Sequence, residues 1–188
     1  MNDYRIFVGA FPEGDLADRV QAVRLKHDAK TARITSPHVT IVGTYWRSGP
    51  PTPENEAATI ERLRSIENQL QPFEMQIGGV ETFLPDNPVI YLHIEPTLEL
   101  VAARQALLRV IGQDKQRHFT PHLTLTMRLD HPKTEALLPQ LRQTNWHTRR
   151  WSALIDHVWL MQRAPSDPAW RYIYRVEMSA SPSLRGAA

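Results

Sequence analysis

The stretch Ser36-Pro37-His38-Val39-Thr40-Ile41 recurs 84 residues later as Thr120-Pro121-His122-Leu123-Thr124-Leu125. The two copies agree at proline, histidine and threonine, and the other positions exchange only similar residues. The offset is close to half of the 188-residue chain, which is typical of a protein built from two related units. The sequence therefore predicts one bilobal domain over residues 1–188, in which each lobe contributes one His-x-Thr motif.

Each copy has the pattern of a strand that begins beside a proline. Successive side chains of a strand point to opposite faces, so His38 and Thr40 share one face while Val39 and Ile41 occupy the other. Proline is tolerated at the first residue of a strand, where no N–H is needed for the ladder. We therefore expect each histidine to lie near the mouth of its strand, on the same face as its threonine.

The segments around the motifs mix strands with helices. Apolar alternation predicts strands, and apolar residues at helical spacing predict helices. The expected strands cover residues 4–11, 36–43, 73–83, 89–95, 120–126, 151–163 and 171–178, and the expected helices cover residues 16–29, 53–70, 97–111 and 133–143. Because 73–83 and 89–95 form a hairpin, strand and helix do not alternate strictly, and the expected class is α+β. Residues 179–188 lack apolar periodicity and are expected to form a flexible tail.

The composition excludes several kinds of chemistry. The chain has no cysteine, which rules out disulfide scaffolds, thiol nucleophiles and iron–sulfur clusters. It contains neither Gly-x-Gly-x-x-Gly nor Gly-x-x-x-x-Gly-Lys, the common nucleotide-binding loops. The opening segment has only a short apolar run, from Ile6 to Phe11, so we expect no signal peptide, no membrane partner and a cytoplasmic location.

The charge is unevenly divided between the two halves of the chain. Residues 1–94 contain 9 Lys and Arg against 12 Asp and Glu, whereas residues 95–188 contain 13 against 8. Most of the basic residues in the second half are arginines, whose planar guanidinium suits phosphate. This distribution favours an anionic partner held by the second lobe.

A pair of imidazoles that face one cavity, each two residues from a hydroxyl, suits phosphodiester cleavage without a metal. One neutral histidine takes a proton from the nucleophile, one protonated histidine gives a proton to the leaving oxygen, and threonine hydroxyls donate to phosphate oxygens. The unperturbed pKa of histidine, about 6.5, allows both forms near neutrality, and two close imidazoles resist both being charged. We therefore expect His38 and His122 to be catalytic and Thr40 and Thr124 to bind phosphate, with a bell-shaped pH profile near neutrality.

The motifs His38-Val39-Thr40 and His122-Leu123-Thr124 resemble the signature of the two-histidine (2H) phosphoesterase superfamily. The wider pattern resembles its 2′-5′ RNA ligase, or RNA 2′,3′-cyclic phosphodiesterase, family. The likeness extends over nearly the whole chain, including the first strand, the central hairpin and the closing strands, residues 5–10, 79–94, 158–163 and 170–172. The resemblance implies a pseudo-duplicated fold in which two antiparallel sheets line a central cleft, helices lie outside, and one motif from each lobe faces the other.

The resemblance also implies an activity. Members open a 2′,3′-cyclic phosphate at the end of an RNA or nucleotide without metal or cofactor, typically leaving a 2′-phosphomonoester, and some catalyse a reversible 2′-5′ ligation. In related enzymes the second histidine often activates water and the first protonates the leaving oxygen. By this resemblance His122 is the base and His38 the acid, and we expect the protein to act as a monomer.

Four further residues near the motifs are candidate substrate contacts. Tyr45, Trp46 and Phe119 adjoin the motifs, and aromatic rings commonly stack on the bases of single-stranded RNA. Arg128 is the fourth, because the family often has an arginine five positions after its second histidine, where this chain has Met127. That departure leaves the identity of the substrate open.

Other functions compete with this hypothesis. A zinc site is a rival use of two histidines, but such sites need a third protein ligand, and neither motif supplies one nearby. A second alternative is a module that holds nucleotide or RNA ends without turnover. A third is a phosphodiesterase for a small cyclic-phosphate metabolite.

Overall fold

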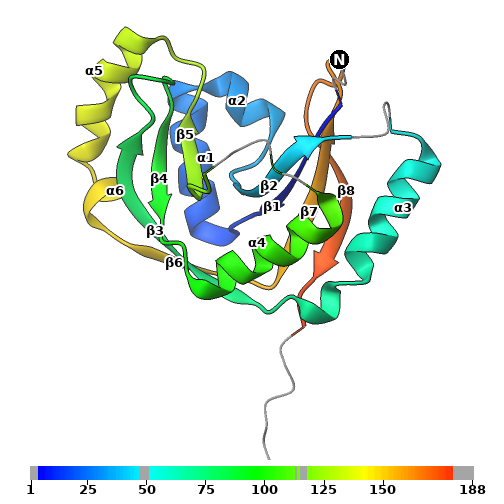
Figure 1. Ribbon diagram of the computed structural model, residues 1–188. Coiled ribbons are helices and arrows are strands. Elements are labelled where there is room, and N and C mark those ends of the chain that lie inside the picture. The colour runs from blue at the N-terminus through cyan, green and yellow to red at the C-terminus, as the bar shows by residue number, and fades with distance from the viewer. Residues whose placement is uncertain (1–3, 47–50, 113, 115–117, 180–188) are drawn as a thin grey trace, which may run out of the picture.

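The computed structural model describes residues 4–46, 51–112, 114 and 118–179, so the expected tail lies outside the described residues except for Ser179. The strands are β1 (Arg5–Ala10), β2 (Val39–Tyr45), β3 (Phe73–Thr82), β4 (Ile90–Ile94), β5 (His122–Thr126), β6 (Trp151–Ile155), β7 (His157–Arg163) and β8 (Arg171–Glu177). The helices are α1 (Gly14–His27), α2 (Ala29–Ile34), α3 (Pro53–Arg64), α4 (Leu98–Ile111), α5 (His131–Arg142) and α6 (Asn145–Thr148), with a 3₁₀ turn at Glu67–Gln69. The mixture confirms the α+β class (Figure 1).

The strands form two antiparallel groups of four that meet edge to edge. Their order is β6-β3-β4-β5-β2-β1-β7-β8, so β5 and β2, the two motif strands, lie side by side in the middle. They are joined by a single register pair, Val39 with Leu123. The two sheets expected from the resemblance are therefore the halves of one continuous eight-stranded sheet.

Residues 151–163 are not one strand, as the apolar pattern predicted, but two. The strand structure is interrupted at Asp156, which lies between the end of β6 and the start of β7. β6 pairs with β3 in one half of the sheet, whereas β7 pairs with β1 in the other. The break is required because the chain crosses between the halves at this residue. The structure also shortens the expected helix 53–70, which ends at Arg64, and adds the short helices α2 and α6.

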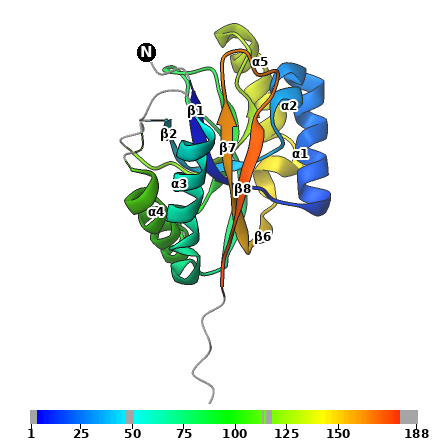
Figure 2. The same cartoon turned by 90° about the vertical axis from the view of Figure 1, so that its right-hand side faces the viewer.

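The helices connect the two halves of the sheet crosswise. Helix α1 follows β1 but contacts β5, and helix α4 follows β4 but contacts β2. Figure 2 shows α3 and α4 on one side of the sheet and α1, α2 and α5 on the other. Each motif strand is thus supported by a helix that comes from the opposite half, which couples the positions of the two motifs.

The core confirms the alternation inferred from the motifs. Val39, Ile41, Leu123 and Leu125 are fully buried, while His38, Thr40, His122 and Thr124 are only partly buried. Burial of each such apolar side chain stabilises the fold by about 1.5–3 kcal/mol relative to exposure. Val39, Ile41, Leu123 and Leu125 belong to one hydrophobic cluster that spans both halves, so the motif strands share the same support, while Phe7, Phe11 and Met161 form a second, smaller cluster.

No helix among the described residues has both the length and the apolar character that a membrane span requires.

Candidate active site

The single pair that joins the two halves of the sheet also assembles the candidate site. One residue further in each direction, antiparallel pairing places His38 opposite Thr124, and Thr40 opposite His122. Residues directly opposite in an antiparallel pair point to the same face. The register therefore brings the four motif side chains together as a square, in which each histidine faces the threonine of the other motif.

Both imidazoles are anchored in the same way. Nδ1 of His38 lies 2.8 Å from the carbonyl oxygen of Ser36, and Nδ1 of His122 lies 2.7 Å from that of Thr120. A carbonyl can only accept, so each Nδ1 carries a proton and donates it to the backbone two residues earlier. This fixes the tautomer, and Nε2 of each ring remains as the nitrogen that can accept or give a proton at the site.

Aromatic side chains outside the predicted set of site residues hold the two rings. Phe7 stacks on His38 with ring centroids 4.7 Å apart, and Phe11 lies 5.4 Å away. Phe83 and Tyr91 lie 5.0 and 5.1 Å from the ring of His122. Their positions in the neighbouring strands and loops were readable from the sequence, but the contacts depend on the strand register.

Burial lowers the pKa of both histidines. It lowers the pKa of His38 to about 4, against the opposing effect of the hydrogen bond to Ser36, and the positive charge of Arg24 lowers it further. The pKa of His122 is also lowered by burial, with the hydrogen bond to Thr120 opposing the shift. The charge of His122 itself disfavours protonation of His38, so the two rings lie close enough to interact.

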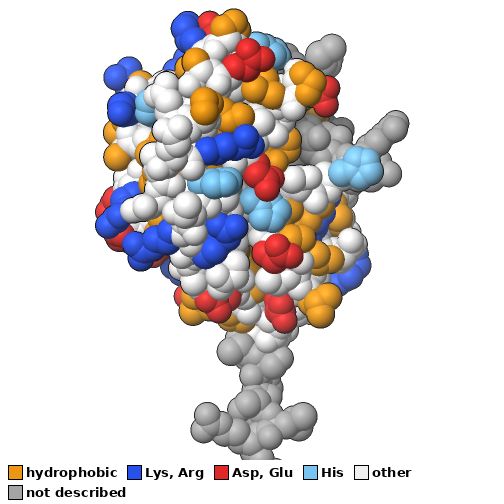
Figure 3. All heavy atoms as spheres, turned by 90° about the vertical axis from the view of Figure 1, so that its left-hand side faces the viewer, with side chains coloured by type: hydrophobic (Ala, Val, Ile, Leu, Met, Phe, Trp, Pro, Cys, Tyr) orange, Lys and Arg blue, Asp and Glu red, His pale blue; other side chains and the backbone are white. Residues whose placement is uncertain are grey.

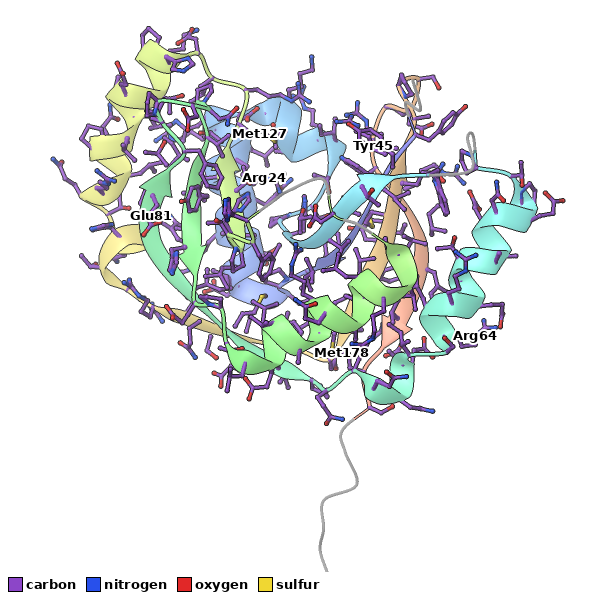
Figure 4. The ribbon with its side chains drawn as sticks, viewed as in Figure 1. Arg24, Tyr45, Arg64, Glu81, Met127 and Met178 are labelled. Carbon is purple, nitrogen blue, oxygen red and sulfur yellow. The ribbon has the colours of Figure 1, made fainter. Side chains whose placement is uncertain are left out.

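The surroundings of the two rings differ in charge. Tyr91, whose ring packs on His122, donates a hydrogen bond to Glu81 at 3.2 Å, and burial together with this carboxylate raises the pKa of Tyr91 to about 12. A carboxylate thus stands behind His122, whereas a guanidinium stands behind His38. Figure 4 shows Arg24 near the centre of the molecule, with Glu81 towards one side and Tyr45 towards the other.

Arg24 holds the segment that precedes the first motif. Its side chain is 1% exposed, and Nη2 donates to the carbonyl oxygens of Thr31 and Thr35 at 3.1 and 2.9 Å. Asp28, nearby, accepts from the backbone N–H groups of Met127 and Arg128, directly after β5. The turn between α1 and α2 therefore ties the entrance of one motif strand to the exit of the other.

Replacement of Arg24 by methionine is expected to lower the free energy of unfolding by about 2–4 kcal/mol, because the buried carbonyl of Thr31 and the partly buried carbonyl of Thr35 lose their donor. Chemical denaturation monitored by circular dichroism measures the change. Arg33→Met, at an exposed position of α2, is the matched control and should stay within about 0.5 kcal/mol of the parent protein. Equal stability of the two variants would contradict the role given to Arg24.

The four candidate substrate contacts lie in different environments. Trp46 is 5% exposed, and its indole N–H donates to Gln162, so it is a core residue with no face open for stacking, contrary to the expectation. Tyr45 is exposed, at the end of β2 away from His38. Phe119 is partly buried with the guanidinium of Arg104 4.3 Å from its ring centroid. Arg128 is exposed in the bend after β5, which ends at Thr126.

Charges of both signs surround the second half of the sheet. Figure 3 shows histidines, basic residues and acidic residues interspersed on the side of the molecule that lies at the left in Figure 1. His93, for example, lies 3.7 Å from Glu81 and 3.6 Å from Glu95. The arginines of the second half do not form a uniform basic patch on this face. Within the part of the chain that the structure describes, no three His, Asp or Glu side chains are grouped as metal ligands would be.

Comparison with known proteins places these features in context. Residues 12–167 match the family model of the 2′-5′ RNA ligase superfamily. A protein of Bacillus cytotoxicus named as a phosphoesterase is 30% identical over 139 residues, which cover 73% of this chain and 77% of the relative. A protein of Oceanobacillus iheyensis with the same designation is 29% identical over 141 residues, covering 74% of this chain and 80% of the relative.

A solved structure has the same fold. The crystal structure of E. coli LigT complexed with 3′-AMP aligns with a TM-score of 0.61 at 17% identity, covering 94% of this chain and 99% of that one.

Proposed function

This chain belongs to the 2′-5′ RNA ligase superfamily, and we propose that it hydrolyses 2′,3′-cyclic phosphates at the ends of RNA or nucleotides, leaving a 2′-phosphomonoester. The observation that carries the proposal is the square of two histidines and two threonines, with both Nδ1 atoms anchored and both Nε2 atoms left for proton transfer. The 3′-AMP bound by LigT supports a nucleotide as the ligand.

The chemistry needs one proton removed and one supplied. A neutral imidazole accepts a proton from water through Nε2 as the water oxygen bonds to phosphorus. The bond from phosphorus to the 3′ oxygen breaks, and the protonated Nε2 of the second imidazole gives its proton to that oxygen. The hydroxyls of Thr40 and Thr124 donate to the non-bridging oxygens, where negative charge grows in the transition state. The product keeps its phosphate on the 2′ oxygen.

The environments of the two rings favour a definite order of roles. The resemblance implies that His122 is the base and His38 the acid. The guanidinium of Arg24, however, disfavours the protonated form of His38 in addition to burial, which lowers the pKa of that ring to about 4. The lowered pKa of His122 comes from burial, with the hydrogen bond to Thr120 opposing it. We therefore propose the reverse order, with neutral His38 as the base and protonated His122 as the acid.

The pH dependence of kcat/KM should be displaced to the acid side of neutrality. Activity requires one ring neutral and one protonated, and burial lowers both pKa values below 6.5. Activity should rise as pH increases through about 4, because His38 then loses its proton. Activity should fall again before pH reaches the ordinary histidine pKa, because His122 then loses its proton. Unperturbed histidines would give a pH optimum near neutrality. Burial of the two rings therefore shifts the expected pH optimum to a lower value.

Steady-state rates from pH 3 to 9 with a 2′,3′-cyclic nucleotide measure this profile. An optimum at pH 7 or above would contradict the influence of burial on the two rings. The profile alone does not assign the roles, because exchange of acid and base gives the same bell shape.

An RNA oligomer that ends in a 2′,3′-cyclic phosphate provides the test of the proposed function. Its 3′ end should be converted to a 2′-phosphomonoester, which can be identified by mass spectrometry and by its resistance to an enzyme that removes only 3′-phosphates. Tight binding without any product would favour the non-catalytic module. Efficient turnover of small cyclic phosphates but not of oligomers would favour the metabolite phosphodiesterase.

A further inference from the structure

A cavity of about 460 Å³ lies beside the candidate active site, at the start of helix α1. Its walls include three aromatic rings, those of Phe11, Trp159 and Tyr172. Trp159 and Tyr172 meet edge to face at 5.1 Å, so the aromatic wall continues from β7 to β8. The volume falls in the range typical of small-molecule sites, about 300–1,000 Å³.

The cavity shares two of its lining residues, Phe11 and Ser36, with the surroundings of His38. The ring of Phe11 lies 5.4 Å from that of His38 and 5.3 Å from that of Tyr172. Ser36 also lines the cavity, and its carbonyl anchors His38 while its hydroxyl is 3.2 Å from that of Tyr172. A ligand with its phosphate at the histidine pair would thus reach the cavity with the part of the molecule that extends past Phe11.

The lining discriminates between kinds of ligand. Flat aromatic walls suit a planar ring, because stacking on an aromatic side chain stabilises any base. The charged side chains among the described lining residues are the carboxylates of Glu13 and Asp18. Carboxylates accept hydrogen bonds and repel anions, so the cavity disfavours a second phosphate. They also favour an exocyclic amino group, which offers two N–H donors, over the edge of uracil, whose single N3–H lies between two carbonyl oxygens that a carboxylate repels.

We propose that this cavity receives the nucleobase of the substrate and selects bases that carry an exocyclic amino group, namely adenine, cytosine and guanine, over uracil. The inference rests on the proposed function, since it assumes that the histidine pair holds the phosphate of a nucleotide. It assigns the stacking role to Phe11, Trp159 and Tyr172, and the selection of the base edge to Glu13 and Asp18.

The stacking role is tested by the binding of nucleoside 2′-monophosphates, the products of the proposed reaction. Tyr172→Ala should weaken the binding of 2′-AMP by about tenfold or more, measured by calorimetry. Tyr174→Ala is the matched control. The register shift in the β7–β8 pair places Tyr174 opposite buried Leu160, away from the cavity, and its hydroxyl is bound by Glu67. It should change the dissociation constant less than about twofold, since it removes no ring from the cavity.

The selection role is tested by comparing kcat/KM for 2′,3′-cyclic AMP and 2′,3′-cyclic UMP. The wild-type protein should favour the adenosine substrate by about fivefold or more, and the double variant Glu13→Gln with Asp18→Asn should remove most of that preference. Asp15→Asn, in the first turn of the same helix but paired with Arg19, is the control and should keep it.

The outcomes separate this inference from the function on which it rests. Turnover of both cyclic nucleotides, with affinity and preference unaffected by the Tyr172 and carboxylate variants, would overturn the cavity assignment and leave the proposed function intact. Binding of 2′-AMP that depends on Tyr172, without turnover of any cyclic phosphate, would support the cavity assignment and overturn the proposed function.

Discussion

Replacement of either His38 or His122 by alanine is expected to lower kcat for a 2′,3′-cyclic nucleotide by about 10²–10⁴-fold, because each ring transfers one proton in the same step. The threonines and the cavity remain in either variant, so KM should change far less than kcat. Since the two rings act as one unit, the double variant should lose little more than the worse single variant. Single-turnover rates of all three proteins measure these losses.

His131→Ala provides the control for these variants. His131 is exposed at the start of α5, where its Nε2 lies 3.1 Å from the carbonyl of Pro85. Its replacement should leave kcat within about twofold of the parent value, as is usual for surface positions. If either catalytic variant retained the parental rate, or if the losses of the two single variants simply multiplied, the histidines would not form one acid–base pair.

A substrate that needs no acid is expected to distinguish the two histidines. In a 4-nitrophenyl ester of a nucleoside phosphate, 4-nitrophenolate leaves without needing a proton. The loss of rate caused by His122→Ala should therefore shrink to about tenfold or less on this substrate. The loss caused by His38→Ala should remain about 10²–10⁴-fold, since the base is still required. Release of 4-nitrophenolate, followed by its absorbance, measures both rates.

The opposite pattern, rescue of His38→Ala with His122→Ala still impaired, would restore the order of roles implied by the family resemblance. Equal impairment of both variants on the activated substrate would mean that neither ring serves only as the acid. In either case, the charge of Arg24 beside His38 would not determine the order of proton transfer.

The composition of the candidate site could be predicted from the sequence because it depends on local geometry. Alternation along a strand places His38 with Thr40, and His122 with Thr124, whatever the rest of the fold does. Their meeting across β2 and β5 depends on a single non-local pair, which no local pattern specifies. The aromatic neighbours of the two rings were missed for the same reason, because strand register determines which side chains lie across from a given residue.

The structure differs from the expectations based on the sequence at two other places, and each difference has a physical cause. The apolar run from residue 151 to residue 163 is continuous, so the sequence pattern could not show that β6 and β7 belong to opposite halves of the sheet. Trp46 adjoins the first motif in sequence, yet it lies in the core because Gln162 on β7 satisfies its indole N–H. Neighbouring position in the chain predicts proximity to a site, but burial is decided by the strands packed on either side.

The two histidines are expected to hydrolyse a cyclic phosphate without help from a metal ion. Steady-state turnover of 2′,3′-cyclic AMP in excess chelator tests it most directly. We expect the same rate with and without chelator, and a single product, adenosine 2′-monophosphate. Loss of activity in chelator, with recovery on addition of zinc, would contradict it.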